Sequence, residues 1–292
     1  MKRRQFLKDA AICTTTIASL QQLETLADEL EPTETMPALF LGHGSPMNAI
    51  EDNKFVAGFR QVASTIAKPR AILCISAHWY TQGTKVTSME LPKTIHDFGG
   101  FPKELYEVQY PAPGEVKLAA ETQKLLAPAE IALDQSWGLD HGAWSVLVHM
   151  YPDADIPVIQ LSVDRTQGPQ YHYELGKRLA KLRQQGVLIV GSGNLIHNLR
   201  EIDFQRINQE GYGYDWAQEA NAFFTKQLET GEYTPLIQYQ KQGKAVARSI
   251  PTPDHYLPLL YVLGLPHEPG SLEIFNNQLV GGSIGMLSLK VG

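Results

Sequence analysis

Four histidines of this chain lie beside apolar runs, at places from which a side chain can reach a binding crevice. His43 follows the run PALFLG, His78 follows AILCISA, and His197 comes shortly after VLIVGSGN. His255 lies in PTPDHYLP, just before an apolar segment with helical spacing. Imidazole is the commonest metal ligand in proteins, and open α/β sheets bind ligands outside the carboxyl ends of their strands. This arrangement predicts a metal site.

Each of these histidines also has a structural alternative. His43 lies between two glycines and could serve a tight turn, while His78 could bond the backbone at the end of a buried strand. The loop before His197, GSGN, lacks the spacing of a nucleotide-binding motif, so we interpret it as a turn that presents His197. His255 follows an aspartate near a helix start, where either residue could act as a cap.

Two further histidines are candidates for contact with a substrate. His141, in WGLDHG, begins a helix-like segment. A helix N-terminus and burial both disfavour imidazolium, so a neutral His141 could act as a base, or it could simply cap the helix. His96, in HDFGGFP, could contact a substrate from a loop or lie at the surface. We interpret His149, His172 and His267 as structural or solvated.

Composition excludes several classes of protein. The chain has 292 residues, is 43% hydrophobic and 19% charged, and carries a net charge of −6, which is typical of a folded soluble protein. Its basic residues form no long run beyond the first eight positions, which argues against a nucleic-acid partner. No apolar stretch reaches the roughly 18 residues of a spanning helix, so we expect no membrane insertion. The chain has two cysteines, Cys13 and Cys74. Cys13 lies in the first 35 residues, which we interpret below as a leader and linker, so at most one thiol belongs to the fold. This excludes a disulfide framework and a thiolate metal site.

The body of the chain alternates strand-like and helix-like segments, which predicts a single α/β domain with a mostly parallel central sheet flanked by helices. We place this domain at residues 36–292, with its metal site at the C-terminal edge of the strands, and predict a long loop over the crevice at 81–113. The expected strands are 37–42, 71–76, 157–163, 187–190 and a closing set within 274–291. The expected helices are 55–66, 115–126, 144–151, 171–182, 216–228 and 256–263.

Residues 1–35 are interpreted as a leader and linker outside the fold. The sequence RRQFLK at positions 3–8 is similar to a twin-arginine export signature, and it precedes a mildly apolar stretch. Thr25, Leu26 and Ala27 offer small residues for cleavage. We expect export to the periplasm; the alternative is a cytoplasmic protein with a short amphipathic N-terminal helix.

Long stretches of the body resemble the 4,5-DOPA extradiol dioxygenase-like proteins of the class III extradiol ring-cleavage (LigB-type) superfamily. The resemblance rests on MPALFLGHGSPMN, SAHW, TIHDFGGFP, YPAPG, DHG, MYPDADIPVIQLS, SGNLIHNLR and TPDHYLPLLYVLG. It implies extradiol cleavage of a catechol, such as 3,4-dihydroxyphenylalanine, with O₂ and one divalent metal ion, Zn(2+) or Fe(2+). It also implies His43, His78, His197 and His255 as metal ligands and His141 as the acid–base residue.

The implied ligand set departs from the usual iron site. Non-haem Fe(II) oxygenases typically use two histidines and one carboxylate, whereas here every matching position is a histidine, which suits zinc as well. The alternatives are therefore a zinc-dependent hydrolase and a non-catalytic metal-binding protein. Four permanent ligands would leave little room for a catechol, so we expect His255, or His197, to bind weakly or only when substrate is absent. The oligomeric state is not predicted.

Overall fold

The computed structural model describes residues 35–268 and 270–292, and Thr35–Gly292 form one compact unit. The predicted leader lies outside the described residues. An eight-stranded sheet with the order β4-β3-β5-β2-β6-β1-β10-β7 runs through the unit. Its strands are β1 (Ala38–Gly42), β2 (Ala71–Thr81), β3 (Thr84–Thr87), β4 (Ile131–Asp134), β5 (Val158–Asp164), β6 (Val187–Gly193), β7 (Leu272–Phe275) and β10 (Ser288–Val291).

The centre of the sheet is parallel and its edges are mixed. β1 pairs in parallel with β6, β6 with β2, and β2 with β5. β10 pairs antiparallel with β1 on one side and with β7 on the other. At the other edge β3 pairs antiparallel with β5 and parallel with β4. The short strands β8 (Leu279–Val280) and β9 (Ile284–Gly285) form a separate ribbon. The predicted α/β class with a mostly parallel sheet is confirmed.

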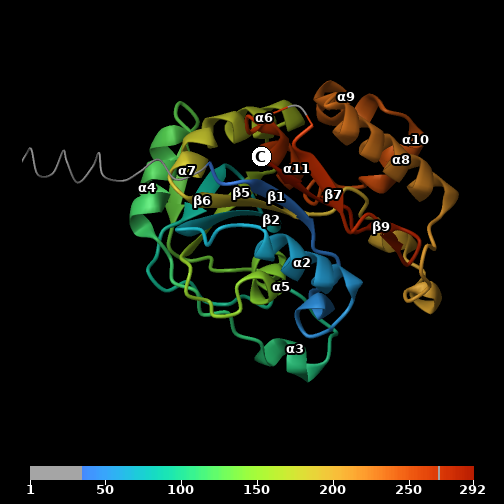
Figure 1. Cartoon of the computed structure of the whole chain (residues 1–292), viewed down its shortest axis with the longest axis horizontal. Helices are drawn as coiled ribbons and strands as arrows, with labels where there is room; N and C mark the ends of the chain where they lie inside the picture. The colour runs from blue at the N-terminus through green and yellow to red at the C-terminus, as the bar shows by residue number, and fades with distance from the viewer. Residues whose placement is uncertain (1–34, 269) are drawn as a thin grey trace, which may run out of the picture. The chain divides into compact units, whose positions relative to one another are not determined.

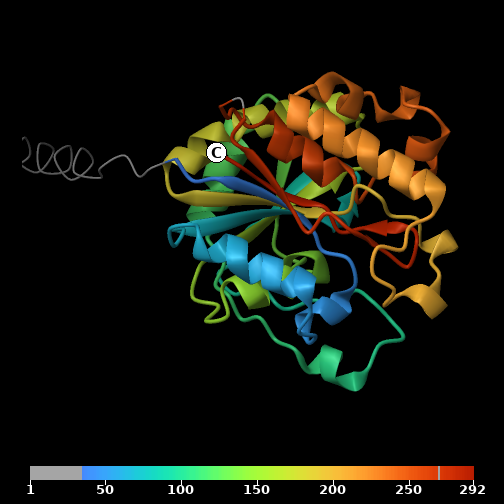
Figure 2. The same cartoon turned by 45° about the vertical axis from the view of Figure 1, so that its right-hand side comes forward.

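Helices cover both faces of the sheet (Figures 1 and 2). They are α2 (Lys54–Ser64), α3 (Lys103–Glu107), α4 (Val116–Leu125), α5 (His141–Met150), α6 (Pro169–Arg178), α7 (Ala180–Gln184), α8 (Asp215–Thr230), α9 (Tyr233–Ile237), α10 (Lys244–Ser249) and α11 (Leu257–Gly264). None of the helices in residues 35–268 and 270–292 has the length and apolarity needed to cross a bilayer.

Alternation along the strands divides the core into two layers. In β1, Phe40 belongs to the cluster that packs on α4, α6, α7, α8 and α11, while its neighbour Leu39 belongs to the cluster with α2 and α5. This is expected for a parallel strand buried on both faces, since successive side chains point to opposite sides. Cys74, a free buried thiol in β2, lies in the second layer.

Three predictions of local structure were wrong in detail. The stretch 81–113 was expected to be one loop, but it contains β3 and α3, whose four and five residues are too short to show a periodicity. The helix expected over 171–182 is two helices, α6 and α7, because the chain breaks helical bonding at Leu179. The strand expected at 71–76 continues as β2 to Thr81, across a shift of register between Ile75 and Tyr80.

Candidate metal centre and active site

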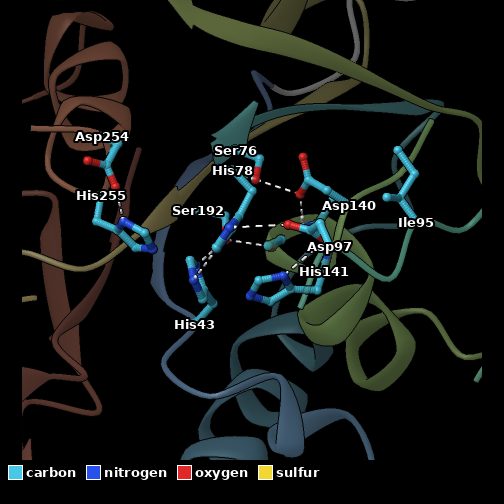
Figure 3. A network of polar contacts seen from close by, with 12 residues as sticks. His43, Ser76, His78, Ile95, Asp97, Asp140, His141, Ser192, Asp254 and His255 are labelled. Carbon is cyan, nitrogen blue, oxygen red and sulfur yellow. Dashed lines mark hydrogen bonds and ion pairs between the residues drawn. The ribbon is translucent and has the colours of Figure 1, made fainter. Parts of the chain in front are cut away.

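The carboxyl ends of the central strands bring distant histidines together. His43 directly follows β1, whose last residue, Gly42, pairs with Gly193 at the end of β6. His78 lies in the last part of β2, within the register shift between Ile75 and Tyr80. His255 approaches from the segment before α11. Figure 3 shows these side chains converging from three different parts of the chain.

The rings of His43, His78 and His255 form a nearly regular triangle. Their centroids are 5.0 Å apart between His43 and His78, 5.3 Å between His43 and His255, and 4.9 Å between His78 and His255. His43 and His255 are buried and His78 is nearly so. Judged by ligating atoms that all lie within 4.8 Å of one another, His43 and His78 form a group with His141, and His255 forms one with His197 and Asp254.

The hydrogen-bond partners of His43 fix which nitrogen carries its proton. His43 Nδ1 lies 3.0 Å from Ser192 Oγ, and that hydroxyl donates its only hydrogen to the carbonyl of Gly142. Ser192 Oγ can therefore only accept from His43, so Nδ1 is protonated and Nε2 presents a lone pair. The tautomer is an inference from the network of bonds.

The surroundings of His78 favour the same tautomer. Its Nδ1 lies 3.2 Å from Asp97 Oδ2, where a protonated nitrogen is attracted to the carboxylate and a lone pair would be repelled. His78 Nε2 is then also a lone pair, and it lies 3.1 Å from His43 Nε2. Two lone pairs at this distance repel each other unless a cation lies between them.

A proton is a poor candidate for that cation. Burial, together with the neighbouring imidazoles, holds the pKa of His43 and of His78 well below the usual value. A metal ion fits better: two nitrogens bound at about 2.0–2.1 Å in a tetrahedral site lie about 3.3 Å apart, close to the observed separation. The residues present therefore fit a metal ion.

His255 adds a third free nitrogen. Its Nδ1 bonds to the carboxylate of Asp254, and its buried Nε2 has no hydrogen-bond partner. A buried nitrogen without a partner is costly unless something fills its place. Burial alone would raise the pKa of Asp254, but its bonds with His255 outweigh burial and lower that pKa to about 2. An ionised Asp254 keeps the Nδ1 proton on His255 and leaves Nε2 as the donor.

The backbone also holds His255 tightly in place. A Cβ added to Gly193 would lie 2.1 Å from the carbonyl oxygen of His255, so only glycine permits this approach. The next residue, Asn194, donates its backbone N–H to the same oxygen at 2.9 Å. The GSGN turn therefore anchors the segment that carries His255, as well as leading to His197.

His197 lies beside the triangle and stacks on one of its members. Its ring is nearly parallel to that of His255, with centroids 3.5 Å apart. Its pKa is lowered to about 3 by burial and then by His255, so the ring is neutral. Ligating atoms of His197, Asp254 and His255 lie within 4.8 Å of one another. His197 thus belongs to a second group of residues that could hold a metal ion.

His141 adjoins the triangle on the opposite side. It is the first residue of α5 and is 5% exposed, and its ring centroid lies 3.7 Å from that of His78. Ligating nitrogens of His43, His78 and His141 also lie within 4.8 Å of one another. The structure therefore allows His141 either to act beside the metal or to bind it.

A buried carboxylate sets the position of α5 and hence of His141. Asp140 is the N-cap of the helix and accepts a bond from the backbone of Ala143. It also accepts bonds from Ser76 Oγ at 2.6 Å, Gln160 Nε2 at 2.7 Å and Trp137 Nε1 at 3.2 Å. Burial, with the charge of Asp97, raises the pKa of Asp140. Its role is structural, because every partner belongs to the scaffold.

Comparison with known proteins decides the family. Residues 37–287 match the family described as the catalytic LigB subunit of aromatic ring-opening dioxygenase. The chain belongs to this family. It is an extradiol ring-cleaving dioxygenase, which confirms the enzyme class predicted from the sequence.

Relatives from bacteria and plants agree with this assignment. An Escherichia coli K12 protein named 4,5-DOPA dioxygenase extradiol is 46% identical over 272 residues, covering 91% of this chain and 98% of that protein. A Beta vulgaris protein of the same name is 38% identical, covering 86% of this chain and 94% of that protein. The crystal structure of an uncharacterised Escherichia coli K12 protein matches with a TM-score of 0.75 and 42% identity, covering 88% of this chain and 100% of that one.

In this dioxygenase, His96 lies outside the histidine cluster. Its Nε2 bonds to the carbonyl of Val108 at 3.0 Å. Its ring lies 5.8 Å from that of Phe98, which in turn lies 5.5 Å edge-on from His141. Phe98 therefore lies next to both His96 and His141, the candidate acid–base residue. The contact of His96 with substrate stays a prediction.

Sequence reasoning missed a carboxylate that contacts two of the clustered histidines. Asp97 reaches His78 with one oxygen and His141 with the other (Figure 3). Burial would raise the pKa of Asp97, but the contacts with His141, including its backbone N–H, outweigh burial and hold that pKa below its usual value. The only signal in the sequence was its position beside His96 in HDFGGFP.

Proposed function

We propose that this dioxygenase opens a catechol such as 3,4-dihydroxyphenylalanine beside its diol, using O₂ and one divalent metal ion held by His43, His78 and His255. The observation that carries the metal assignment is the pair of Nε2 atoms, from His43 and His78, that face each other at 3.1 Å. The names of the Escherichia coli and Beta vulgaris relatives support the catechol.

We propose Fe(2+) as the metal of the active enzyme. Three imidazole ligands suit Zn(2+) equally well, but zinc is redox-silent and opening a ring with O₂ requires electron transfer. A bound iron would supply that redox chemistry and hold both reactants. Zinc in a purified sample would then mean a misloaded site or a different reaction.

His141 is proposed as the acid–base residue. Its ring lies 3.7 Å from that of His78 and 5.6 Å from that of His43, close enough to reach a substrate bound beside them. It would take the proton of a catechol hydroxyl and return a proton as the ring opens. Phe98 packs edge-on against His141, near Phe101 and Tyr106. These rings offer an apolar wall to an aromatic substrate.

Metal-dependent assays separate this proposal from its alternatives. We expect protein loaded anaerobically with Fe(2+) to consume O₂ and yield a ring-opened product when 3,4-dihydroxyphenylalanine is added in air. The Zn(2+) form should be inactive towards the catechol. Hydrolysis of a small polar substrate by the Zn(2+) form would favour the hydrolase, and inactivity of both forms would favour a metal-binding protein.

The two histidines of the stacked pair are expected to differ in their effect on the metal. His255 has a free buried Nε2 and a carboxylate on Nδ1, whereas His197 lies against its face. Of the two, His197 is thus the better candidate for the weak or interchangeable ligand. We expect His255→Ala to lower metal affinity by at least tenfold more than His197→Ala, measured by competition with a chelator. Equal losses would show that both are permanent ligands.

We propose export to the periplasm by the twin-arginine route, with residues 1–35 as leader and linker and 36–292 as the catalytic domain. The paired Arg3 and Arg4 support this proposal. Lysine at both positions keeps the charge but removes the guanidinium groups. We expect the Arg3→Lys/Arg4→Lys protein to stay in the cytoplasm at full length while the wild type is exported and shortened. Cell fractionation measures this, and an uncleaved cytoplasmic wild type would contradict it.

A further inference from the structure

One carboxylate, Asp97, touches two histidines to which we assign different tasks. Its Oδ2 lies 3.2 Å from Nδ1 of His78, a proposed metal ligand. Its Oδ1 accepts the backbone N–H of His141 at 2.9 Å and lies 3.0 Å from Nδ1 of the same residue. Figure 3 shows Asp97 beside both rings. Nδ1 of His141 makes no hydrogen bond with this oxygen. The bond from the backbone N–H of His141 is therefore the one that holds Asp97.

We propose that Asp97 is a positioning residue that sets the tautomer of His78 and the place of His141 through a single carboxylate. The proposal rests on the proposed function for the tasks of the two histidines. An ionised carboxylate only accepts hydrogen bonds, so the Nδ1 of His78 that faces it carries the proton and Nε2 of His78 is left as a lone pair. Carboxylate partners of this kind orient metal-binding histidines and raise their basicity.

The hydrogen bond from the backbone N–H of His141 determines which oxygen of Asp97 faces which histidine. The N–H of His141 is one of the free donors at the start of α5, where the helix dipole also favours a negative charge. A backbone N–H can only donate, so the oxygen that accepts from it, Oδ1, stays on the side of His141. Oδ2 is thereby aimed at His78.

Asp140 shows by contrast what a purely structural carboxylate looks like here. It is fully buried, and its hydrogen-bond donors are side chains and backbone of the scaffold. Asp97 is partly exposed, and its two oxygens lie beside the imidazoles of His78 and His141. A carboxylate with these partners acts on the orientation of the site more than on the stability of the fold.

Asp97→Asn tests the proposal with almost no change of shape. The amide oxygen should stay on the N–H of His141, so the amide NH₂ faces His78 Nδ1. Two donors cannot face each other, so His78 must move its proton to Nε2, the nitrogen needed for the metal. We expect ¹⁵N NMR of full-length, chelator-treated protein to show His78 with Nδ1–H in the wild type and Nε2–H in Asp97→Asn.

Metal binding gives a second readout that does not depend on turnover. With Zn(2+) alone as the probe, we expect the affinity of Asp97→Asn to fall by about 10–100-fold, the usual effect of removing such a partner. Asp97→Glu should keep Nδ1–H on His78 and recover part of the affinity. Asp155→Asn removes an equal charge from a surface ion pair with Lys68 and should match the wild type.

The tautomer of His78 decides the outcome. A folded Asp97→Asn protein that keeps Nδ1–H on His78 would overturn the proposal, whatever its activity; circular dichroism and thermal unfolding establish that it is folded. If the tautomer shifts as expected but the wild type opens no catechol with any metal, the proposed function fails and the positioning role of Asp97 stands.

Discussion

His43→Ala is expected to lower the metal content from about one equivalent per chain to background and to abolish catechol turnover. The substitution removes one of the two Nε2 atoms that face each other across 3.1 Å, and the imidazole is anchored by Ser192 at the end of β1. No other side chain can take its place from the same strand end, because Gly42 and Gly44 flank it. Elemental analysis of anaerobically purified protein, paired with an assay of catechol oxidation, measures both effects.

His267→Ala is the matched control for this loss. His267 bonds to Tyr233 and to the backbone of Leu265, and it belongs to neither of the histidine groups within the described part of the chain. It should keep the metal and the activity of the wild type. Retention of a full equivalent of metal by His43→Ala would reject His43 as a ligand.

His141→Ala is expected to keep the metal and lose turnover by about 10²–10⁴-fold, the usual contribution of a positioned acid or base. The triangle of His43, His78 and His255 remains complete in this variant, so the metal has no reason to leave. Single-turnover rates on Fe(2+)-loaded protein, together with metal analysis of the same sample, separate catalysis from binding.

The geometry also defines the result that would reverse this assignment. Because the nitrogens of His43, His78 and His141 can approach one centre, loss of metal from His141→Ala would make His141 a ligand. His255 would then be the residue free to contact substrate. A His141→Ala protein with metal and full turnover would remove His141 from both tasks.

The positions of His43 and His78 could be predicted because strand ends are a local property. The runs PALFLG and AILCISA are apolar on both faces, as strands buried in a parallel sheet must be. Parallel strands end at one edge, so the polar residues that follow them must meet. The structure places both rings there, at 5.0 Å.

Asp97 could not be found in this way, because its position depends on tertiary contacts. The segment that carries it is held by bonds between Ile95 and Leu139 and between Leu139 and Lys93, which tie it to the residues just before α5. Nothing in the sequence of HDFGGFP indicates that pairing. Asp97, a partner of the histidines and not a proposed metal ligand, therefore lies in a motif already singled out for His96.

The register shift of β2 could not be predicted from the sequence, for a similar reason. The apolar run ends near Ser76, but the strand continues to Thr81 through a change of register opposite β5. His78 lies within this irregular part, where one residue more or less would turn its ring to the other face of the sheet. Such a bulge is set by the neighbouring strand and has no signature in residue type.

Labelled oxygen gives the most direct test of the central claim, that one metal held by histidines supports O₂-dependent opening of a catechol. Extradiol cleavage breaks the C–C bond beside the diol, so one oxygen atom of O₂ enters the new carboxylate and the other the new aldehyde. Fe(2+)-loaded protein given 3,4-dihydroxyphenylalanine under ¹⁸O₂ should consume one O₂ per catechol and yield a carboxylate with one ¹⁸O. A product whose new carboxylate oxygen comes from water, or bound iron with no O₂ consumption, would contradict the account.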